Sequence, residues 1–280
     1  MPELPEVETI KLGLQKYLVG KKILGVEVRL RRIFSGDEKN IIGAKVISVD
    51  RFGKGLVINL NNGYSIAAHI KLTGQFVYRD SITSKLKLSP KVGQQIPNKF
   101  THISFKLDKG AYLHYNDIRQ FGWVKVLKTK DLKTIPFFKD LGPEPFKGLT
   151  FELFEKIIKS SNVAIKPLIM DQKKIGGIGN IYANDALFDS AIDPRRKAKT
   201  LTDAEIKKLY DSILKVLKKG LENGGASELN YVNALGQEGK YQHHFLAYGQ
   251  DGKKCVRCGN IMKKITLGGR GAYFCENCQK

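Results

Sequence analysis

The hydrophobic residues of this 280-residue chain recur with one spacing in its first half and with another in its second half. No other feature of the sequence restricts the fold as strongly. Apolar side chains alternate with polar ones along several short segments between residues 26 and 127. Beyond a glycine- and proline-containing run at residues 141–145, they recur every three or four positions. Alternation is typical of strands and the longer period of helices, so we expect a β-domain followed by helices.

The alternating segments predict an antiparallel β-domain flanked by one helix. That helix is indicated by apolar residues at Val7, Ile10, Leu14, Tyr17 and Leu18. Strands are predicted near residues 26–30, 56–60, 103–107, 113–115 and 123–127, with turns at residues 61–63 and 108–110. Links of hairpin length without intervening helices favour a sandwich or a flattened barrel.

The second half of the chain predicts several helices. One apolar stripe consists of Phe151, Phe154, Ile157 and Ile158, and residues 181–188 predict a short helix behind a glycine turn. Thr202 and Glu205 have the spacing of a capping box, which opens a longer helix. Its expected inner residues are Ile206, Leu209, Ile213, Leu217 and Leu221, and the run Asn-Gly-Gly at residues 223–225 ends it.

The charge of the chain points to a polyanionic partner. Its 48 Lys and Arg residues exceed its 27 acidic residues, which gives a formal net charge of +21. Nucleic acid is the first candidate for such a surplus, although a solubilising surface or a lysine bias of the genome would give the same count. The acidic start MPELPEVETI is unlike a signal peptide, and no apolar run is long enough for a membrane helix. We therefore expect a cytoplasmic protein with no membrane partner.

All four cysteines lie in two CxxC motifs near the C-terminus, namely Cys255 with Cys258 and Cys275 with Cys278. In a reducing cytoplasm this spacing favours metal ligands over disulfides. Four thiolates close a tetrahedron around zinc and leave no open position, so we expect one structural zinc ion and no organic cofactor. Arg270 lies between the motifs among glycines, where it either contacts a phosphate or belongs to a solvated turn.

A second glycine-rich turn, at residues 176–179, precedes Asn180 and the short helix that follows it. Exposed backbone N–H groups and the helix dipole favour a phosphate at such a position. Asn180 could donate to the same anion, and Lys166 could supply positive charge. A tight turn between two helices would need the same glycines, and the turn by itself favours neither interpretation.

The first residues suggest a nucleophile. Removal of the initiator methionine would leave Pro2 as a free secondary amine, which can attack a sugar carbon and form an iminium ion. Glu3 could act beside it as a general acid, and Glu6, one turn onward, could orient the amine. Proline and glutamate are also common where helices begin, and local sequence alone favours that simpler interpretation.

The chain resembles the bacterial formamidopyrimidine-DNA glycosylases over essentially its whole length. The resemblance rests on motifs in the family's order: PELPEVET at residues 2–9, Lys54 in RFGKG, NDIRQFG at residues 116–122, GIGNIY at residues 177–182, and the final zinc finger with Arg270. It implies an α+β multidomain fold, with an N-terminal antiparallel β-sandwich flanked by a helix, a helix-two-turns-helix module and a zinc-finger β-hairpin. It also implies base-excision repair of 8-oxoguanine and formamidopyrimidines in duplex DNA, with abasic-site cleavage by β,δ-elimination.

The resemblance implies a catalytic role for several matching residues. Pro2 would be the Schiff-base nucleophile, Glu3 the proton donor, and Glu6 an orienting group. Lys54 would serve β-elimination and Arg270 δ-elimination. The implied DNA contacts come from Arg119, Phe121, Leu72, His69, Lys166 and Asn180. Arg119 and Phe121 would fill the space of the flipped nucleotide, and His69 could equally be a packing residue.

The resemblance also predicts the domains and the partner. The expected divisions are a catalytic β-sandwich at 1–134, a linker at 135–149, the helix-two-turns-helix module at 150–225, a lesion-recognition loop at 226–249 and the zinc finger at 250–280. The expected partner is double-stranded DNA containing oxidised purines or abasic sites, held between the domains by a monomer.

A few residues depart from the family's motifs. Leu72 replaces a usual Met, Ile118 and Gln120 replace Pro and Arg, and Phe100 stands where relatives often have His. Leu72 is still apolar, so wedging should survive, but preference for the opposite base stays open. Two rival functions fit parts of the sequence. One is a non-catalytic zinc DNA-binding protein, which would give no role to Pro2 and Glu3. The other is a sister glycosylase that acts on oxidised pyrimidines, which residues 4–9 fit less well.

Overall fold

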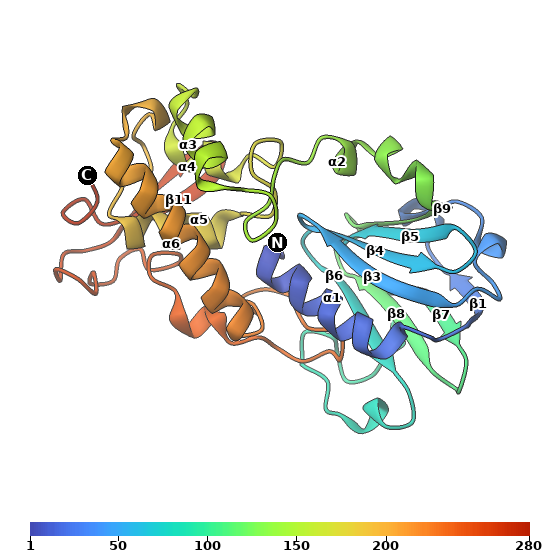
Figure 1. The fold of residues 1–280 in the computed structure, drawn as a ribbon. Coiled ribbons are helices and arrows are strands. Elements are labelled where there is room, and N and C mark those ends of the chain that lie inside the picture. The colour runs from blue at the N-terminus through green and yellow to red at the C-terminus, as the bar shows by residue number, and fades with distance from the viewer. The chain divides into compact units, whose positions relative to one another are not determined.

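The computed structural model describes residues 1–280, which form two units. The first consists of Met1–Lys139 with Leu221–Gln242, and the second of Asp140–Gly220 with His243–Lys280. Strands dominate the first unit and helices the second, as the two hydrophobic periods predict (Figure 1).

The first unit contains α1 (Leu4–Leu18) and two β-sheets. The four-stranded sheet is antiparallel, with the order β1 (Ile23–Val28), β7 (Thr101–Leu107), β8 (Tyr112–Asp117) and β6 (Gly74–Arg79). The five-stranded sheet has the order β2 (Phe34–Ser35), β9 (Trp123–Lys128), β5 (Tyr64–His69), β4 (Gly55–Leu60) and β3 (Val46–Phe52). Only the short pair of β2 with β9 is parallel.

One hydrophobic core lies between the sheets and under α1. It combines Ile58 and Ile66 of the five-stranded sheet with Phe76 and Phe105 of the four-stranded sheet. The expected stripe of α1 contributes its buried residues Val7, Ile10, Leu14 and Leu18, and this helix packs on β3. The predicted sandwich flanked by a helix is therefore confirmed.

The outer face of the five-stranded sheet is also covered. Val57 and Ala67 point away from the main core and pack with Ile135 and with Phe137 and Phe138 of α2 (Pro136–Lys139). Short 3-10 turns complete the unit, at η1 (Arg31–Ile33), η2 (Glu38–Asn40), η3 (Thr83–Lys85) and η4 (Thr129–Thr134). The prediction of a strand as far as Leu30 is wrong, because β1 ends at Val28 and η1 begins directly after Leu30.

The second unit contains the predicted helices and hairpin. Its elements are α3 (Phe151–Lys159), α4 (Ile165–Met170), α5 (Asn180–Ser190), η5 (Ala198–Thr200), α6 (Asp203–Glu222), η6 (Tyr241–His244), β10 (Lys263–Leu267) and β11 (Arg270–Phe274), with α6 and η6 running past the unit's limits. The capping box is confirmed, because Thr202 Oγ1 accepts from the backbone of Glu205 and Glu205 Oε2 from that of Thr202. Leu221 is only partly buried on α6, whereas the other expected inner residues are buried. None of the helices combines the length and the apolar composition that a bilayer-spanning segment requires.

Candidate functional site

The N-terminal residues Pro2, Glu3 and Glu6 are buried where α1 begins. Glu3 is the N-cap of this helix, and its backbone N–H donates to Oε2 of Glu6 at 2.7 Å. Glu3 and Glu6 are 2 % and 1 % exposed, and Pro2 is also buried. The contact belongs to a capping box. The carboxylate of Glu6 therefore fixes the backbone that follows Pro2, as an orienting role requires.

Glu6 also contacts a segment from far along the chain. Its Oε1 accepts a hydrogen bond from the backbone N–H of Ala226 at 2.7 Å. The preceding Gly225 has a φ of +81°, and a Cβ at this position would lie 2.8 Å from Cγ of Glu6. Glycine is required here both for the left-handed backbone and for the close approach. One carboxylate thus joins the N-terminal cluster to residues 225–226.

Lys54 lies in the turn between β3 and β4, directly after Gly53, and is only 3 % exposed. Arg51 supports this turn, because its Nη1 donates to the carbonyl of Gly53 at 2.9 Å and its Nε to Oε2 of Glu8 at 2.7 Å. Burial raises the pKa of Glu8, but the hydrogen bonds and charges of Arg51 and Lys11 together outweigh burial, so the pKa is lowered. The Arg51–Glu8 pair therefore anchors the turn with Lys54 to α1.

His69 occupies a buried position at the end of β5. Its ring packs edge-on against Phe137 at 4.7 Å between centroids, and Nδ1 accepts from the backbone N–H of Lys71 at 3.0 Å. Burial, together with the charges of Lys71 and Lys54, lowers the pKa of His69 to about 3. The ring is therefore uncharged at neutral pH, which favours the packing alternative, and a phosphate contact stays a prediction. Leu72 lies nearby in the chain, in the turn before β6.

Arg119 and Phe121 project from a loop that is held by hydrogen bonds to Asp117 and Thr73. The buried Asp117 accepts hydrogen bonds from the hydroxyl of Thr73 and from the backbone N–H of Gly122, and Thr73 accepts from the backbone N–H of Arg119. The guanidinium of Arg119 lies 4.9 Å from the ring centroid of Phe121, and Phe121 is 55 % exposed. An exposed aromatic ring on a fixed loop is suited to enter a base stack.

In the second unit, Lys166 and Asn180 contact each other. Lys166 is fully buried, and its Nζ donates to Oδ1 of Asn180 at 2.6 Å. Asn180 is the first residue of α5, behind Gly177 with a φ of +92°. Because its oxygen is occupied by Lys166, the amide nitrogen of Asn180 is left to donate to an anion at this helix N-terminus. Asn180 is therefore the member of this pair that an anion can reach, and the phosphate contact expected of both residues stays a prediction.

Arg270 stands at the tip of the hairpin of β10 and β11. Leu267 pairs with Arg270 across a two-residue turn, in which Gly268 and Gly269 have φ of +57° and +71°. Positive φ at both positions is typical of a type I′ turn, which glycine tolerates. Arg270 is exposed, so its guanidinium is available to an external phosphate.

Two buried polar residues of α5, Asn184 and Asp185, are not among the residues that the sequence predicts for the site. Asn184 Oδ1 accepts from the backbone N–H of Tyr273, and its Nδ2 donates to the carbonyl of Gly271 at 3.3 Å, which fastens the hairpin of Arg270 to the helix. Asp185 accepts from three successive backbone N–H groups, at Leu246, Ala247 and Tyr248. The detectable signal is two adjacent polar residues in the middle of the helix, between the apolar residues Ile181–Ala183 and Ala186–Phe188.

The cysteines Cys255, Cys258, Cys275 and Cys278 form one cluster, with all ligand atoms within 4.8 Å of one another. Sγ atoms of Cys255 and Cys278 are 3.8 Å apart, and those of Cys258 and Cys275 are 3.5 Å apart. Zinc bound to four thiolates at about 2.3 Å in a tetrahedron requires sulfur separations of about 3.8 Å. The geometry therefore fits a zinc ion.

The candidate residues are divided between the two units. The first unit holds Pro2, Glu3, Glu6, Lys54, His69, Leu72, Arg119 and Phe121, and the second holds Lys166, Asn180, Arg270 and the four cysteines. Within the first unit the structure brings Glu3 into contact with Glu6, and within the second it brings Lys166 into contact with Asn180.

Comparison with known proteins decides the family. Residues 1–124 match the formamidopyrimidine-DNA glycosylase N-terminal domain, residues 141–230 its H2TH domain, and residues 252–280 the zinc finger found in FPG and IleRS. Formamidopyrimidine-DNA glycosylases of Pelotomaculum thermopropionicum and Streptococcus mutans are 41 % and 37 % identical, over 100 % of this chain and 99 % and 100 % of theirs. The chain belongs to the formamidopyrimidine-DNA glycosylase family.

Solved structures agree with this assignment. Fpg of Lactococcus lactis in complex with DNA containing an abasic site superposes with a TM-score of 0.87 at 31 % identity, covering 99 % of both chains. MutM (Fpg) of Thermus thermophilus has the same TM-score at 32 % identity, covering 99 % of this chain and 98 % of its own. As a member of the formamidopyrimidine-DNA glycosylases, the chain is a base-excision-repair enzyme, and abasic-site lyase activity is general in the family. Its four cysteines hold one structural zinc ion.

Proposed function

We propose that this enzyme excises oxidised purines, namely 8-oxoguanine and formamidopyrimidines, from double-stranded DNA and then cleaves the abasic site. The observation that carries the proposal is the buried N-terminal cluster, in which Glu6 holds the backbone beside Pro2 and Glu3. The Lactococcus lactis enzyme, 30 % identical, is solved with DNA containing FAPY-dG, which supports the substrate class. A net charge of +21 suits a polyanionic substrate.

Excision begins at Pro2 once Met1 has been removed. The nitrogen attacks C1′ of the damaged nucleotide, a C–N bond forms, and the bond to the base breaks. The base leaves with the electron pair and takes up a proton, for which Glu3 is the donor. An ordinary α-amine has a pKa of about 7.7–8.0 and is partly uncharged at neutral pH. The N-terminus of α1 favours that uncharged form.

Cleavage of the backbone follows from the iminium ion. This ion forms when the C1′–O4′ bond breaks, which opens the sugar ring and leaves O4′ to take up a proton. Loss of a proton from C2′ then expels the 3′ phosphate, and loss of a proton from C4′ expels the 5′ phosphate. Lys54 is the acid of the first elimination, and Arg270 holds the phosphates during the second. A compact ammonium can deliver a proton, whereas a guanidinium keeps its charge and grips a phosphate with two N–H groups.

The remaining candidate residues bind the DNA backbone and help to extrude the damaged base. Lys166 and Asn180 hold a backbone phosphate, and Leu72, Arg119 and Phe121 replace the extruded nucleotide in the stack. We assign residues 150–225 to DNA binding and residues 226–249 to recognition of the lesion. The enzyme acts in the bacterial cytoplasm, at the nucleoid, because its DNA substrate lies there.

Replacing Arg119 or Phe121 with Ala should impair base excision more than cleavage at a preformed abasic site. Base flipping costs a few kcal/mol, so excision should slow by about 10- to 100-fold. Single-turnover rates on 8-oxoguanine DNA and on abasic DNA measure the two steps separately. Tyr112→Ala, which removes another exposed aromatic ring of the first unit, is the control. Equal losses on both substrates would contradict the wedge assignment.

The substrate class is tested by comparing 8-oxoguanine opposite cytosine with thymine glycol in otherwise identical duplexes. The proposed purine specificity predicts faster excision of 8-oxoguanine under single-turnover conditions. Faster removal of thymine glycol would instead assign the chain to the sister activity on oxidised pyrimidines. Absence of excision from both, with DNA binding intact, would support a non-catalytic DNA-binding protein.

A further inference from the structure

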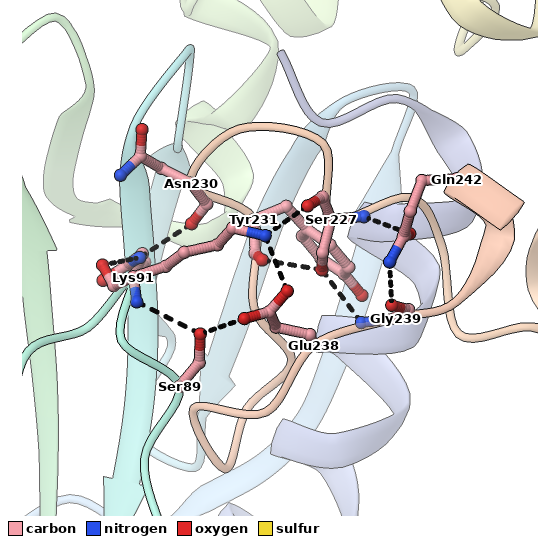
Figure 2. A network of polar contacts seen from close by, with 9 residues as sticks. Ser89, Lys91, Ser227, Asn230, Tyr231, Glu238, Gly239 and Gln242 are labelled. Atoms are coloured by element: carbon pink, nitrogen blue, oxygen red, sulfur yellow. Dashed lines mark hydrogen bonds and ion pairs between the residues drawn. The ribbon is translucent and has the colours of Figure 1, made fainter.

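Lys91 bridges the two ends of the loop formed by residues 228–237. Its ammonium group donates to the backbone carbonyl of Ser227, on one side of the loop, and to Oε2 of Glu238 at 2.6 Å, on the other side (Figure 2). The hydroxyl of Ser227 accepts from the backbone N–H of Gly239 at 2.9 Å, which brings the same two ends together. We call Lys91, Ser227, Glu238 and Gly239 the neck of this loop.

The neck is supported by the segment between β6 and β7. Ser89 Oγ donates to Oε1 of Glu238 at 2.6 Å, so both carboxylate oxygens have a partner from this segment. The hydrogen bond and charge of Lys91 and the hydrogen bond of Ser89 lower the pKa of Glu238, so the carboxylate is ionised at neutral pH. Ser89 and Ser227 are 7 % and 2 % exposed.

A buried amide of β6 fastens the same parts. Gln75 is 2 % exposed, and its Nε2 donates to the carbonyl of Lys91 at 3.0 Å and to the carbonyl of Asn230, within the loop, at 2.7 Å. The backbone N–H groups of Tyr78 and Ser89 donate to the carbonyls of Ala234 and Gly236 at 2.8 and 2.9 Å. The loop is therefore held at its tip as well as at its ends.

The neck lies one residue away from the N-terminal cluster. Ala226, directly before Ser227, donates its backbone N–H to Glu6, and the other oxygen of Glu6 accepts from the backbone N–H of Glu3. Lys91 is thus linked to Glu3 by its hydrogen bond to Ser227, the backbone from Ser227 to Ala226, and the two hydrogen bonds of Glu6. Tyr231 adds a second tie, because its hydroxyl donates to the carbonyl of Gly224 at 2.9 Å.

An ordinary surface ion pair contributes little to stability, about 0–1 kcal/mol. The pair of Lys91 and Glu238 differs from such a pair in two ways. Lys91 and Glu238 are only 24 % and 35 % exposed, and the ammonium also binds a backbone carbonyl of a buried residue. Removing Lys91 would leave both the carbonyl of Ser227 and the carboxylate of Glu238 without this donor.

From this geometry we infer that Lys91 and Glu238 are positioning residues. They hold residues 226–242 in the arrangement that reads the damaged base, whereas Glu6 has its own hydrogen bond to the backbone N–H of Glu3 beside Pro2. This inference rests on the proposed function, because it assigns the loop to lesion recognition. Cleavage of a preformed abasic site depends on the neck less, since no base has to be held.

The test compares Lys91→Met, Glu238→Gln and Lys91→Arg with the unchanged enzyme. For Met and Gln, we expect single-turnover excision of 8-oxoguanine to slow by about 10-fold, which is the effect of losing one charged hydrogen bond. Cleavage of abasic DNA should change by less than about 3-fold. Lys91→Arg keeps the charge and the donors and should restore most of the excision rate. Lys207→Met, which removes an exposed lysine from its pair with Asp211, is the matched control.

A second measurement tests the neck without any reaction. In Lys91→Met, hydrogen exchange at the backbone amides of Ala226 and Gly239 should accelerate, with little change in the strands of the sandwich. Equal losses of excision and abasic-site cleavage, or unchanged excision, would overturn the inference. Failure of the unchanged enzyme to excise 8-oxoguanine would count against the proposed function. Independently of that result, unchanged hydrogen exchange at Ala226 and Gly239 in Lys91→Met would overturn the inference about the neck.

Discussion

An enzyme that retains Met1, so that the nitrogen of Pro2 stays within a peptide bond, should form no covalent adduct with abasic DNA in the presence of borohydride. An amide nitrogen shares its lone pair with the carbonyl and cannot attack a sugar carbon as an amine does. An N-terminal extension that prevents removal of Met1 creates this state without changing any residue of the chain. We expect excision and abasic-site cleavage to fall to background while DNA binding persists.

Glu3→Gln separates the nucleophile from the proton donor. Loss of a positioned general acid lowers rates by about 10²–10⁴-fold, so excision should slow by that amount. Trapping on a preformed abasic site should still be detectable, because no base has to leave. Mass spectrometry of the active enzyme gives the decisive control. Full activity with Met1 attached, or with an acylated Pro2, would eliminate the proposed mechanism.

Removing zinc should unfold the C-terminal hairpin. Structural zinc in small fingers binds with an apparent free energy of about 10–16 kcal/mol, which is comparable to the stability of a whole domain, about 5–15 kcal/mol. Without the metal, residues 250–280 have few other buried apolar residues to hold them, chiefly Met262, Ala272 and Phe274. We expect chelation to release one zinc ion per chain, to accelerate hydrogen exchange in β10 and β11, and to weaken DNA binding through the loss of ordered Arg270.

Cys275→Ser is the corresponding variant, and it should lower zinc content and DNA affinity in the same way. Because all four cysteines belong to this cluster, the number of thiols that react with a thiol reagent measures directly how much of the site has lost zinc. Val256→Ala changes a residue of the same cluster's first CxxC motif that is 79 % exposed, and should retain zinc. A hairpin that keeps its protection from exchange after complete zinc removal would contradict the structural role of the metal.

Local patterns accounted for most of the elements. The stripe from Val7 to Leu18 predicted α1, and the capping box of Thr202 and Glu205 marked the beginning of α6. The turn at residues 108–110 predicted the hairpin of β7 and β8. These signals depend on residues a few positions apart, whose spacing fixes helix faces, strand alternation and turn conformation whatever the rest of the chain does.

Sheet order could not be predicted in the same way. Nothing in the sequence around Phe34 indicates that β2 pairs in parallel with β9, or that β6 lies at the edge of the four-stranded sheet next to β8. The burial of His69 likewise depends on Phe137, which reaches it from α2. Such neighbours are chosen by the packing of whole sheets, so a strand pattern alone leaves them open.

The sequence by itself determined the zinc ligands and the helices α1, α3, α5 and α6, and its motifs at residues 2–9 and 116–122 predict which side chains carry the chemistry. Tertiary structure alone decided how those side chains are held. Glu6 meets Ala226 across 220 positions and Lys91 meets Glu238 across 147. Contacts over such separations form only when the folded chain brings distant backbone groups within hydrogen-bonding distance, and no short-range period records them.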